Sequence, residues 1–521
     1  MRYLGGLLGG TWLTSLAGDL GKGIFDGANL VANFEALHPD NTYWKKIYNL
    51  YSKIDTEASR FLEFEKWWGS PVLLNASEMQ AIADQLFVGN KLAAGGLRSS
   101  EGLRIDLRNI KSPIVVFCSW GDDITPPQQA LDWILDLYDH EDEIVTAGQT
   151  IIYCLHQSIG HLGIFVSGKV ATKEHGEFAQ SMDMIDLMPP GLYEAMITGV
   201  DDTVEHPEWV QGNYLFSLET RTLEDIRALG GNSPEDDLRF ATAARVSEIN
   251  QGIYRTLLGP AVRTAVTEQS AESLRRMHPN RLRFQMFADE NPLIAPVAAW
   301  AEAVRADRRP VSPDNPFLAC ERMVSGIIAD GLEAWGRARD LMQEEIFLNT
   351  YASPWLQALV GLRADGSSPI RRAERDLARE AIAKQTAAYL EQRIDEGGML
   401  EAAVRALIYV RLPEGKVDER GFAALKQIGA ELPAAKRIGF AKFKNVVKEQ
   451  YLILLLDTER AIAALPKLLP DDRRQCEEAL ALVRRVLASR GALPEEGSRR
   501  LQRIETLFAG PTPASGRDKA A

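Results

Sequence analysis

Two apolar runs separated by an amphipathic segment constrain the fold of this chain more than any other feature. Ile114–Trp120 reads I-V-V-F-C-S-W, and Thr150–Leu155 reads T-I-I-Y-C-L. Uninterrupted runs of this kind are typical of strands that are buried on both faces of a sheet. Between them, Gln128–Tyr138 has the three-to-four spacing of an amphipathic helix. This order predicts a βαβ unit, and therefore a parallel sheet in an α/β fold.

Beyond about residue 200 the strand signals fade and helices are predicted. Glu235–Leu258 has helical spacing, and the turn-forming stretch Arg363–Pro369 separates it from a helical tail. Five further helices are predicted in the tail, at Ile370–Ile394, Leu400–Tyr409, Phe422–Leu432, Val446–Leu465 and Asp471–Ala488. We therefore expect an α/β domain with a cap segment at 1–200, a helical region at 201–365, a helical bundle at 366–510 and a disordered tail at 511–521.

Charge, cysteine content and the start of the chain narrow the class of protein. The net charge of −13 argues against sequence-independent binding to nucleic acid. The four cysteines form no C-x-x-C pair, which argues against a disulfide framework and favours a reducing, cytoplasmic location. Met1–Gly18 is similar to a signal peptide, but its glycines disfavour a helix and its apolar run is shorter than the ~20 residues that span a bilayer. A secreted leader and a surface-active segment are alternatives; we expect an interior piece of a larger soluble fold and no transmembrane segment.

Asp122 and His161 are the candidate catalytic residues, because each follows one of the two predicted strands. Sites of parallel sheets form beyond the carboxyl ends of the strands, where a carboxylate can orient an imidazole that acts as a general base. Taken singly, either residue is more often structural. Asp123 competes with Asp122, and His156 lies earlier on the same loop as His161, where we expect it to pack against the strand end.

A nucleophile for this pair is missing from the sequence. No G-x-S-x-G or G-x-C-x-G motif occurs, although such a strand–turn–helix elbow would be needed to present a serine or cysteine. Cys118 and Cys154 lie within apolar runs, where burial raises the pKa of a thiol. Cys320 and Cys476 lie in helical patterns, and we expect all four cysteines to be structural.

Four short motifs around these residues resemble those of polyhydroxyalkanoate synthases. They are F-V-G-N-K-L (Phe87–Leu92), I-D-L-R-N-I-K-S-P-I-V-V-F (Ile105–Phe117), G-D-D-I-T-P (Gly121–Pro126) and S-I-G-H (Ser158–His161). The likeness is closer to a bacterial group labelled 3-hydroxyalkanoate synthetases, whose helical C-terminal extension this chain shares. The resemblance implies the C-terminal part of an α/β-hydrolase fold followed by an all-α extension, and it places Asp122 and His161 on the family's catalytic Asp and His.

The resemblance also implies a chemistry. In such synthases His takes the proton of an elbow cysteine, the thiolate attacks a 3-hydroxyacyl-CoA thioester, and Asp helps to activate the 3-hydroxyl of the acyl group. Two departures are evident: Trp67-Trp68-Gly69-Ser70 differs from the synthases' tryptophan-containing segment, and Met1 corresponds to a point downstream of the elbow. We therefore expect this chain to be inactive alone, and an upstream segment or another chain to complete the sheet.

The expected function is thus acyl transfer from coenzyme A thioesters, with no bound cofactor and no metal. A polyester depolymerase or thioesterase on the same scaffold is the alternative enzyme, and a non-catalytic granule- or partner-binding protein is the alternative without catalysis. The expected partners are 3-hydroxyacyl-CoA or polyester, together with a second copy of the chain in a homo-oligomer or a granule surface.

Overall fold

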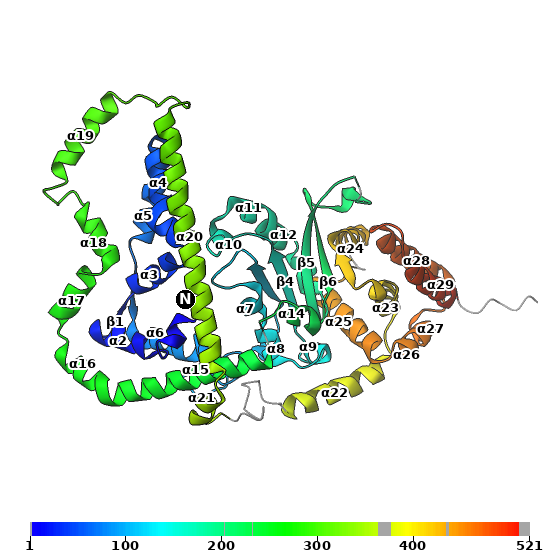
Figure 1. The fold of residues 1–521 in the computed structure, drawn as a ribbon. Helices are drawn as coiled ribbons and strands as arrows, with labels where there is room; N and C mark the ends of the chain where they lie inside the picture. Colours follow the sequence, from blue (N-terminus) through cyan, green and yellow to red (C-terminus); the bar gives the residue numbers. More distant parts are fainter. Residues whose placement is uncertain (1–2, 203, 232, 363–376, 434–436, 510–521) are drawn as a thin grey trace, which may run out of the picture. The chain divides into compact units, whose positions relative to one another are not determined.

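The structure is a computed structural model, and it describes residues 3–509 except 203, 232, 363–376 and 434–436 (Figure 1). The chain forms two compact units, and each unit consists of two separate stretches of the sequence. Unit 1 consists of Met1–Leu92 and Ser233–Arg371, and unit 2 consists of Ala93–Asn232 and Arg372–Ala521. The protein is of the mixed α/β type with additional helical parts, and its main sheet lies in unit 2.

The sheet of unit 2 has the strand order β3-β4-β5-β6-β7. The first three strands are parallel, whereas β6 and β7 are antiparallel to their neighbours. Both predicted strands and their parallel pairing are confirmed, with Ile114 opposite Ile151, but the sheet as a whole is mixed rather than parallel. The strands are β3 (Ile114–Ser119), β4 (Thr150–His156), β5 (Gly191–Gly199), β6 (Tyr214–Thr220) and β7 (Lys416–Asp418).

Short helices pack on both faces of this sheet. The side chains of β4 show this, because they contribute alternately to the apolar clusters on the two faces. Ile151 and Tyr153 belong to one buried cluster, and Ile152 and Cys154 belong to another, because successive side chains of a strand point to opposite faces. The predicted helix at Gln128–Tyr138 forms as two helices that meet at Asp132. The first face is covered by α7 (Pro127–Leu131), α8 (Trp133–Leu137), α9 (Glu141–Thr146) and α14 (Leu223–Arg227), and the second by α12 (Gly176–Gln180) and α13 (Met182–Leu187).

The structure differs from the predicted organisation at β6 and β7. Both strands lie beyond residue 200, where helices are predicted, and β7 falls inside the predicted bundle at 366–510. β7 has only three residues and is fixed by pairing with β6, which comes far earlier in the chain. A strand this short has no periodicity of its own, so only tertiary pairing decides it.

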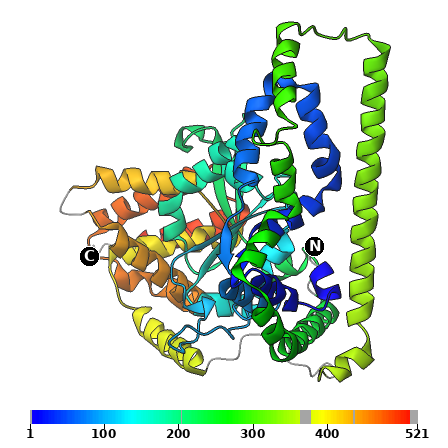
Figure 2. The same cartoon turned by 90° about the vertical axis from the view of Figure 1, so that its left-hand side faces the viewer.

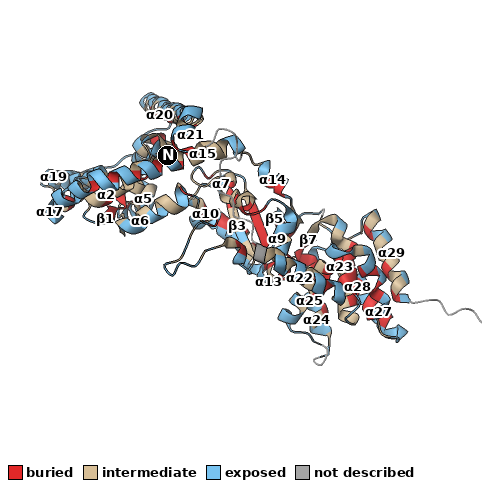
Figure 3. Ribbon diagram, turned by 90° about the horizontal axis from the view of Figure 1, so that it is seen from below, coloured by how far each residue is buried: buried red, intermediate tan, exposed pale blue. Residues whose placement is uncertain are grey.

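The helical part of unit 2 has its own apolar core, in which Ile394, Val410, Ile453 and Ile504 are fully buried. Figure 3 shows buried residues in the sheet and in the helices around α23 and α28. The predicted helix at Val446–Leu465 is interrupted at Asp457, whose side chain caps a new helix. The helices are α22 (Leu377–Arg393), α23 (Met399–Arg411), α24 (Glu419–Glu431), α25 (Phe440–Leu456), α26 (Thr458–Ala463), α27 (Leu465–Leu468), α28 (Arg473–Ala488) and α29 (Glu495–Ala509). The predicted break at Arg363–Pro369 and the predicted tail at 511–521 lie outside the described residues.

Unit 1 is mainly helical, with one small antiparallel pair of strands, β1 (Ile24–Asp26) and β2 (Leu73–Asn75). The predicted helix at Glu235–Leu258 is confirmed as α15, which continues as a π-helical turn at Tyr254–Leu258. The longest helix, α20, is the yellow-green rod in Figure 2. The main helices are α3 (Ala28–Leu37), α5 (Ile54–Trp68), α6 (Ala76–Ile82), α15 (Pro234–Ile253), α17 (Glu268–Arg276), α18 (Pro279–Met286), α19 (Ala295–Ala306) and α20 (Pro316–Tyr351).

The glycine-rich start of the chain forms two helices, α1 (Leu4–Leu7) and α2 (Trp12–Leu20), although its composition predicts a poor helix. Close packing explains the glycine at position 10. Gly10 has φ +93°, and a Cβ atom there would lie 2.7 Å from the Cα atom of Ser247. The backbone N–H of Thr11 donates to Ser247 Oγ at 3.0 Å, so this stretch packs closely against α15. Within the described ranges, none of the helices combines the length and apolarity that crossing a bilayer requires.

Candidate active site

The turns after β3 and β4 pack directly against each other. Trp120 N–H donates to the carbonyl of His156 at 2.9 Å, which extends the strand pairing by one residue. A Cβ atom on Gly121 would lie 2.3 Å from the carbonyl oxygen of Ser158. Only glycine allows that approach, so Gly121 brings the turn that carries Asp122 against the turn that carries His161.

The structure brings the two sequence-predicted residues together. Asp122 Oδ2 lies 2.9 Å from His161 Nδ1 at the carboxyl ends of adjacent parallel strands. Asp122 is 2% exposed, whereas the side chain of His161 is 33% exposed. No hydrogen bond joins Nε2 of His161 to any described residue. The carboxylate therefore orients the ring by Nδ1 and leaves Nε2 for an incoming group.

Hydrogen bonding keeps the buried carboxyl of Asp122 ionised. Burial alone would raise its pKa, but the backbone N–H of Thr125, His161 and the backbone N–H of Ile124 together hold the pKa below its ordinary value. The two amides donate to Oδ1 at 2.9 and 2.8 Å, so Oδ2 is directed to the imidazole. A fixed negative charge at this position stabilises a protonated imidazole, as a general base requires.

Thr125 is a site residue that the sequence reasoning did not single out. Its Oγ1 lies 3.3 Å from Asp122 Oδ2 and 3.2 Å from His161 Nδ1, so the hydroxyl bridges the pair. The signal was its position three residues after Asp122 in the D-D-I-T-P turn, where a side chain returns toward the carboxylate that caps the turn. We infer that Thr125 is a positioning residue for the dyad.

The geometry also separates the competing candidates. Asp123 is exposed, whereas Asp122 faces the imidazole. His156 Nδ1 accepts the backbone N–H groups of Ser158 and Ile159, each at 3.1 Å, and its ring lies at 6.2 Å from that of Phe117. His156 therefore shapes the turn at the strand end.

The cysteines do not approach this dyad. Burial raises the pKa of Cys118 and of Cys154 to about 12, so both thiols in the strands are protonated and inert at neutral pH. Cys476 is also buried, as expected. Cys320 differs from the other three cysteines because it is exposed, on α20. Among the described residues, no group of three His, Cys, Asp or Glu side chains could hold a metal ion.

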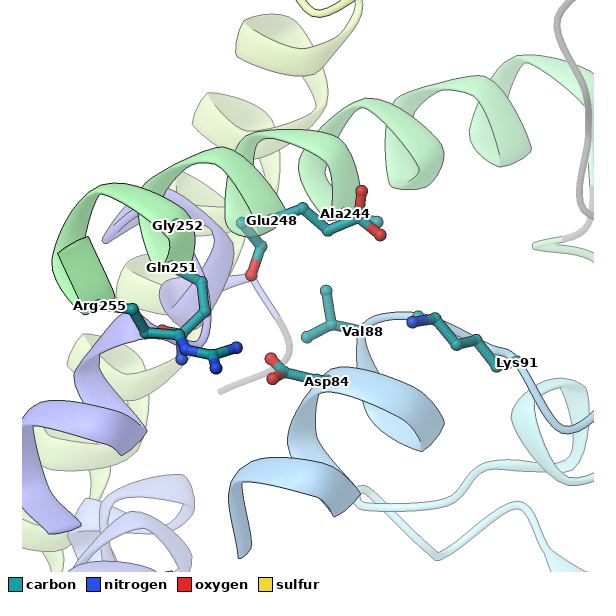
Figure 4. A pocket seen from close by; sticks show the side chains of 10 residues that line it. Asp84, Val88, Lys91, Ala244, Glu248, Gln251, Gly252 and Arg255 are labelled. Carbon is teal, nitrogen blue, oxygen red and sulfur yellow. The ribbon is translucent and has the colours of Figure 1, made fainter. Parts of the chain in front are cut away.

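A small cavity of about 220 Å³ lies in unit 1 (Figure 4). Acidic and basic side chains both face it, so it has no excess charge that would select an anion or a cation. Gln251 Oε1 is buried there without a hydrogen-bond partner among the described residues. None of the sequence-predicted site residues lines this cavity; the charged and amide residues that do are Asp84, Lys91, Glu248, Gln251 and Arg255.

Two buried carboxyls, Glu177 and Glu419, lie in unit 2 outside the motifs described above. Burial and the neighbouring charge of Glu419 raise the pKa of Glu177 to about 7. Burial likewise raises the pKa of Glu419, although its carboxylate accepts the backbone N–H of Phe216 at 3.0 Å. Glu177 Oε2 has no hydrogen-bond partner among the described residues. The ionised form of Glu177 is therefore disfavoured in the fold.

Glu177 should make stability depend on pH. The unfolded side chain ionises near its ordinary pKa, whereas the folded side chain keeps its proton up to about pH 7. The stabilisation is complete below the ordinary pKa, is lost as the pH rises toward 7, and stays lost above it. We expect Glu177→Gln to stabilise the protein at about pH 8 and to have a smaller effect at about pH 5. Urea unfolding at both pH values tests this; an equal effect at both would contradict it.

Comparison with known proteins places the chain in a family. A family profile described as "Protein of unknown function (DUF3141)" matches residues 1–394. A curated relative from Rhizobium meliloti, described as "Uncharacterized protein in ackA 5'region", is 53% identical over 508 residues, which cover 98% of this chain and 69% of the relative. No solved structure matches the chain significantly. Neither description gives an activity, so the likeness to polyhydroxyalkanoate synthases stays a prediction. Because the match spans well over half of its residues, the chain belongs to the family described as "Protein of unknown function (DUF3141)".

Proposed function

We propose that Asp122 and His161 are the acid–base part of an acyl-transfer site of α/β-hydrolase type. The observation that carries this proposal is the 2.9 Å contact between Asp122 Oδ2 and His161 Nδ1 at the ends of adjacent parallel strands. The chain order, acid before histidine, is that of α/β-hydrolases. The motif likeness described above supports a 3-hydroxyacyl-CoA thioester as the acyl donor.

In the proposed reaction His161 Nε2 takes the proton of a thiol or hydroxyl nucleophile. The nucleophile forms a bond to the thioester carbonyl carbon, the C–S bond breaks, and the proton passes from His161 to the departing coenzyme A thiolate. The acyl group then moves to the 3-hydroxyl of an acceptor, or to water in the alternative hydrolase. Asp122 stabilises the imidazolium that forms in both half-reactions.

The open edge of β3 supports an additional strand beside this dyad. Among the described strands, β3 pairs with β4 alone. Val115, the second residue of β3, is 40% exposed, although parallel strands are usually buried between neighbours. A parallel strand added there would end at the same edge of the sheet as Asp122 and His161. We propose that the nucleophile reaches the site on such a strand, supplied by a polypeptide segment other than the described strands.

The test is release of coenzyme A from 3-hydroxybutyryl-CoA. We expect no release above background from the 521-residue chain, because no described thiol or hydroxyl contacts His161 Nε2. The same chain extended by the in-frame codons that precede Met1 in its gene, or combined with the chain that completes the sheet, should turn over. His161→Ala should lower that rate by about 10³-fold or more. His140→Ala, an exposed histidine at the start of α9, is the matched control and should leave it unchanged.

The other possible results of the coenzyme A release test each support or refute one of the proposals. Turnover by the 521-residue chain that His161→Ala abolishes would retain the dyad and refute the external nucleophile. Turnover that His161→Ala does not change would overturn the proposed site. Binding of 3-hydroxybutyryl-CoA without turnover by any of these proteins would support the non-catalytic alternative. Free 3-hydroxybutyrate, in place of polymer, would identify the hydrolase.

A further inference from the structure

The long helix α20 has one face that is packed within unit 1. Ser325, Ala329, Gly336 and Phe347 are buried along this face. Trp44 Nε1 donates to Ser325 Oγ at 2.9 Å, and Pro39 lies so close to Gly336 that a Cβ atom there would be 3.0 Å away. The inner face of α20 thus has its partners in the same unit.

The opposite face of α20 carries a second apolar stripe, which we call the outer seam. Its eight members follow one another at alternating spacings of three and four residues, which is the heptad pattern of coiled coils. All eight are exposed; Phe317 is 83%, Ile327 64% and Leu341 63% exposed. The outer seam consists of Phe317, Cys320, Val324, Ile327, Gly331, Ala334, Ala338 and Leu341.

Apolar residues flank the outer seam on one side and widen its apolar surface. Charged residues flank it on the other side. Trp335 and Met342 are 53% and 58% exposed and lie along one flank. Asp330 and Arg337 occupy the opposite flank at the same position of successive heptads. A stripe of this length, exposed on a 36-residue helix, is typical of a surface that pairs with another helix.

We propose that the outer seam pairs with the outer seam of a second copy of this chain, with the two helices antiparallel. In the register centred between Leu332 and Glu333, apolar side chains meet in every layer, and one layer sets a large side chain against a small one. Val324 lies opposite Leu341 of the second copy, Ile327 opposite Ala338, and Gly331 opposite Ala334. The twofold axis repeats each layer, and Val324 to Leu341 spans about 26 Å of helix.

Charge complementarity selects the antiparallel orientation. In the proposed register Asp330 lies beside Arg337 of the second copy, and the twofold axis forms the same pair again. The other flank places Trp335 beside Ile328 of the second copy. In a parallel pair Asp330 would face Trp335 instead of Arg337, and Ala338 would meet its own small counterpart instead of Ile327.

A cysteine pair tests the register directly in the full 521-residue protein. Cys320 lies opposite Glu345 of the second copy in the antiparallel register, whereas the two Cys320 side chains are about 37 Å apart. Mild oxidation should therefore leave the wild type uncrosslinked and convert Glu345→Cys to a disulfide-linked dimer. The double variant Cys320→Ser/Glu345→Cys is the control and should not crosslink. A crosslink in the wild type would show parallel helices and overturn the proposal.

Charge-reversal variants test whether the partner is a second copy of the chain and whether Asp330 pairs with Arg337 of that copy. Asp330→Arg and Arg337→Asp should each weaken the dimer at least tenfold in sedimentation equilibrium, because every single change creates two like-charge contacts. The combined variant should restore the wild-type dissociation constant. Arg322→Glu, which reverses a charge on the same helix away from the outer seam, should change it little. Ile327→Asp should give a folded monomer, since this side chain is exposed. A monomeric wild type at micromolar concentrations, or a dimer that Ile327→Asp leaves intact, would overturn the proposal.

Discussion

Asp122→Asn should lower turnover by about 10³–10⁴-fold while the protein stays folded, if the dyad acts as proposed. The asparagine oxygen can still accept the backbone N–H groups of Ile124 and Thr125, which now hold Oδ1 at 2.8 and 2.9 Å. Its amide group then takes the place of Oδ2 and donates to His161 Nδ1. The imidazole must carry its proton on Nε2 in that tautomer, so Nε2 can no longer accept the proton of a nucleophile.

This result is measured as kcat and KM for release of coenzyme A by the extended or completed protein described above. The fall should appear in kcat, because the substituted side chain lies behind the imidazole and does not contact the substrate. Asp123→Asn is the matched control: it removes the same charge from the exposed neighbouring residue and should leave kcat unchanged. An Asp122→Asn enzyme with wild-type kcat would show that Asp122 only caps its turn.

The dyad could be predicted from sequence because its determinants are local. Apolar runs identify β3 and β4, the helix between them makes the strands parallel, and parallel strands end at one edge of the sheet. A carboxylate after β3 and a histidine after β4 follow from that arrangement. The choice of Asp122 over Asp123 rested on the likeness to polyhydroxyalkanoate synthases and not on strand pattern, since burial and the direction of the side chain depend on Gly121 meeting the carbonyl of Ser158.

Features fixed by contacts between distant segments could not be predicted. β7 is a strand because β6 offers it an edge. Among the N-terminal glycines, Gly10 is required by its close approach to Ser247. Cys320 lies in a helical pattern that has two apolar faces, and spacing does not reveal which of them packs inside the unit. In each case tertiary packing outweighs the local preference.

Arg405 in the helical core of unit 2 should have the largest effect on stability of any residue considered so far. It is fully buried on α23. Nη1 donates to the carbonyls of Ile394 and Ala461, each at 2.9 Å, and Nε donates to Gln450 Oε1 at 2.7 Å. The carbonyl of Ile394 follows the end of α22, and that of Ala461 lies in the last turn of α26, so one guanidinium serves two helix C-termini.

Removing the side chain of Arg405 should lower the free energy of unfolding far more than removing an exposed arginine side chain. Burial lowers the pKa of Arg405 to about 10, so the group is still charged at neutral pH and stabilises the two carbonyls as a cation. Arg405→Ala leaves three buried acceptors without donors and a cavity, which together should lower the free energy of unfolding by about 4 kcal/mol. Arg405→Met fills most of the space, so its smaller loss separates the cavity from the missing hydrogen bonds.

Urea unfolding of the three proteins, with hydrogen exchange to locate the change, measures these differences. The amides of α22, α23 and α26 should lose protection in Arg405→Ala, because the guanidinium joins these helices. Arg499→Ala is the control: its side chain is 67% exposed and pairs only with Glu496 on the same helix, so its effect should stay within about 0.5 kcal/mol. If Arg405→Ala were no more destabilising than this control, the carbonyls would be served by water, and the core around Arg405 would be open to solvent.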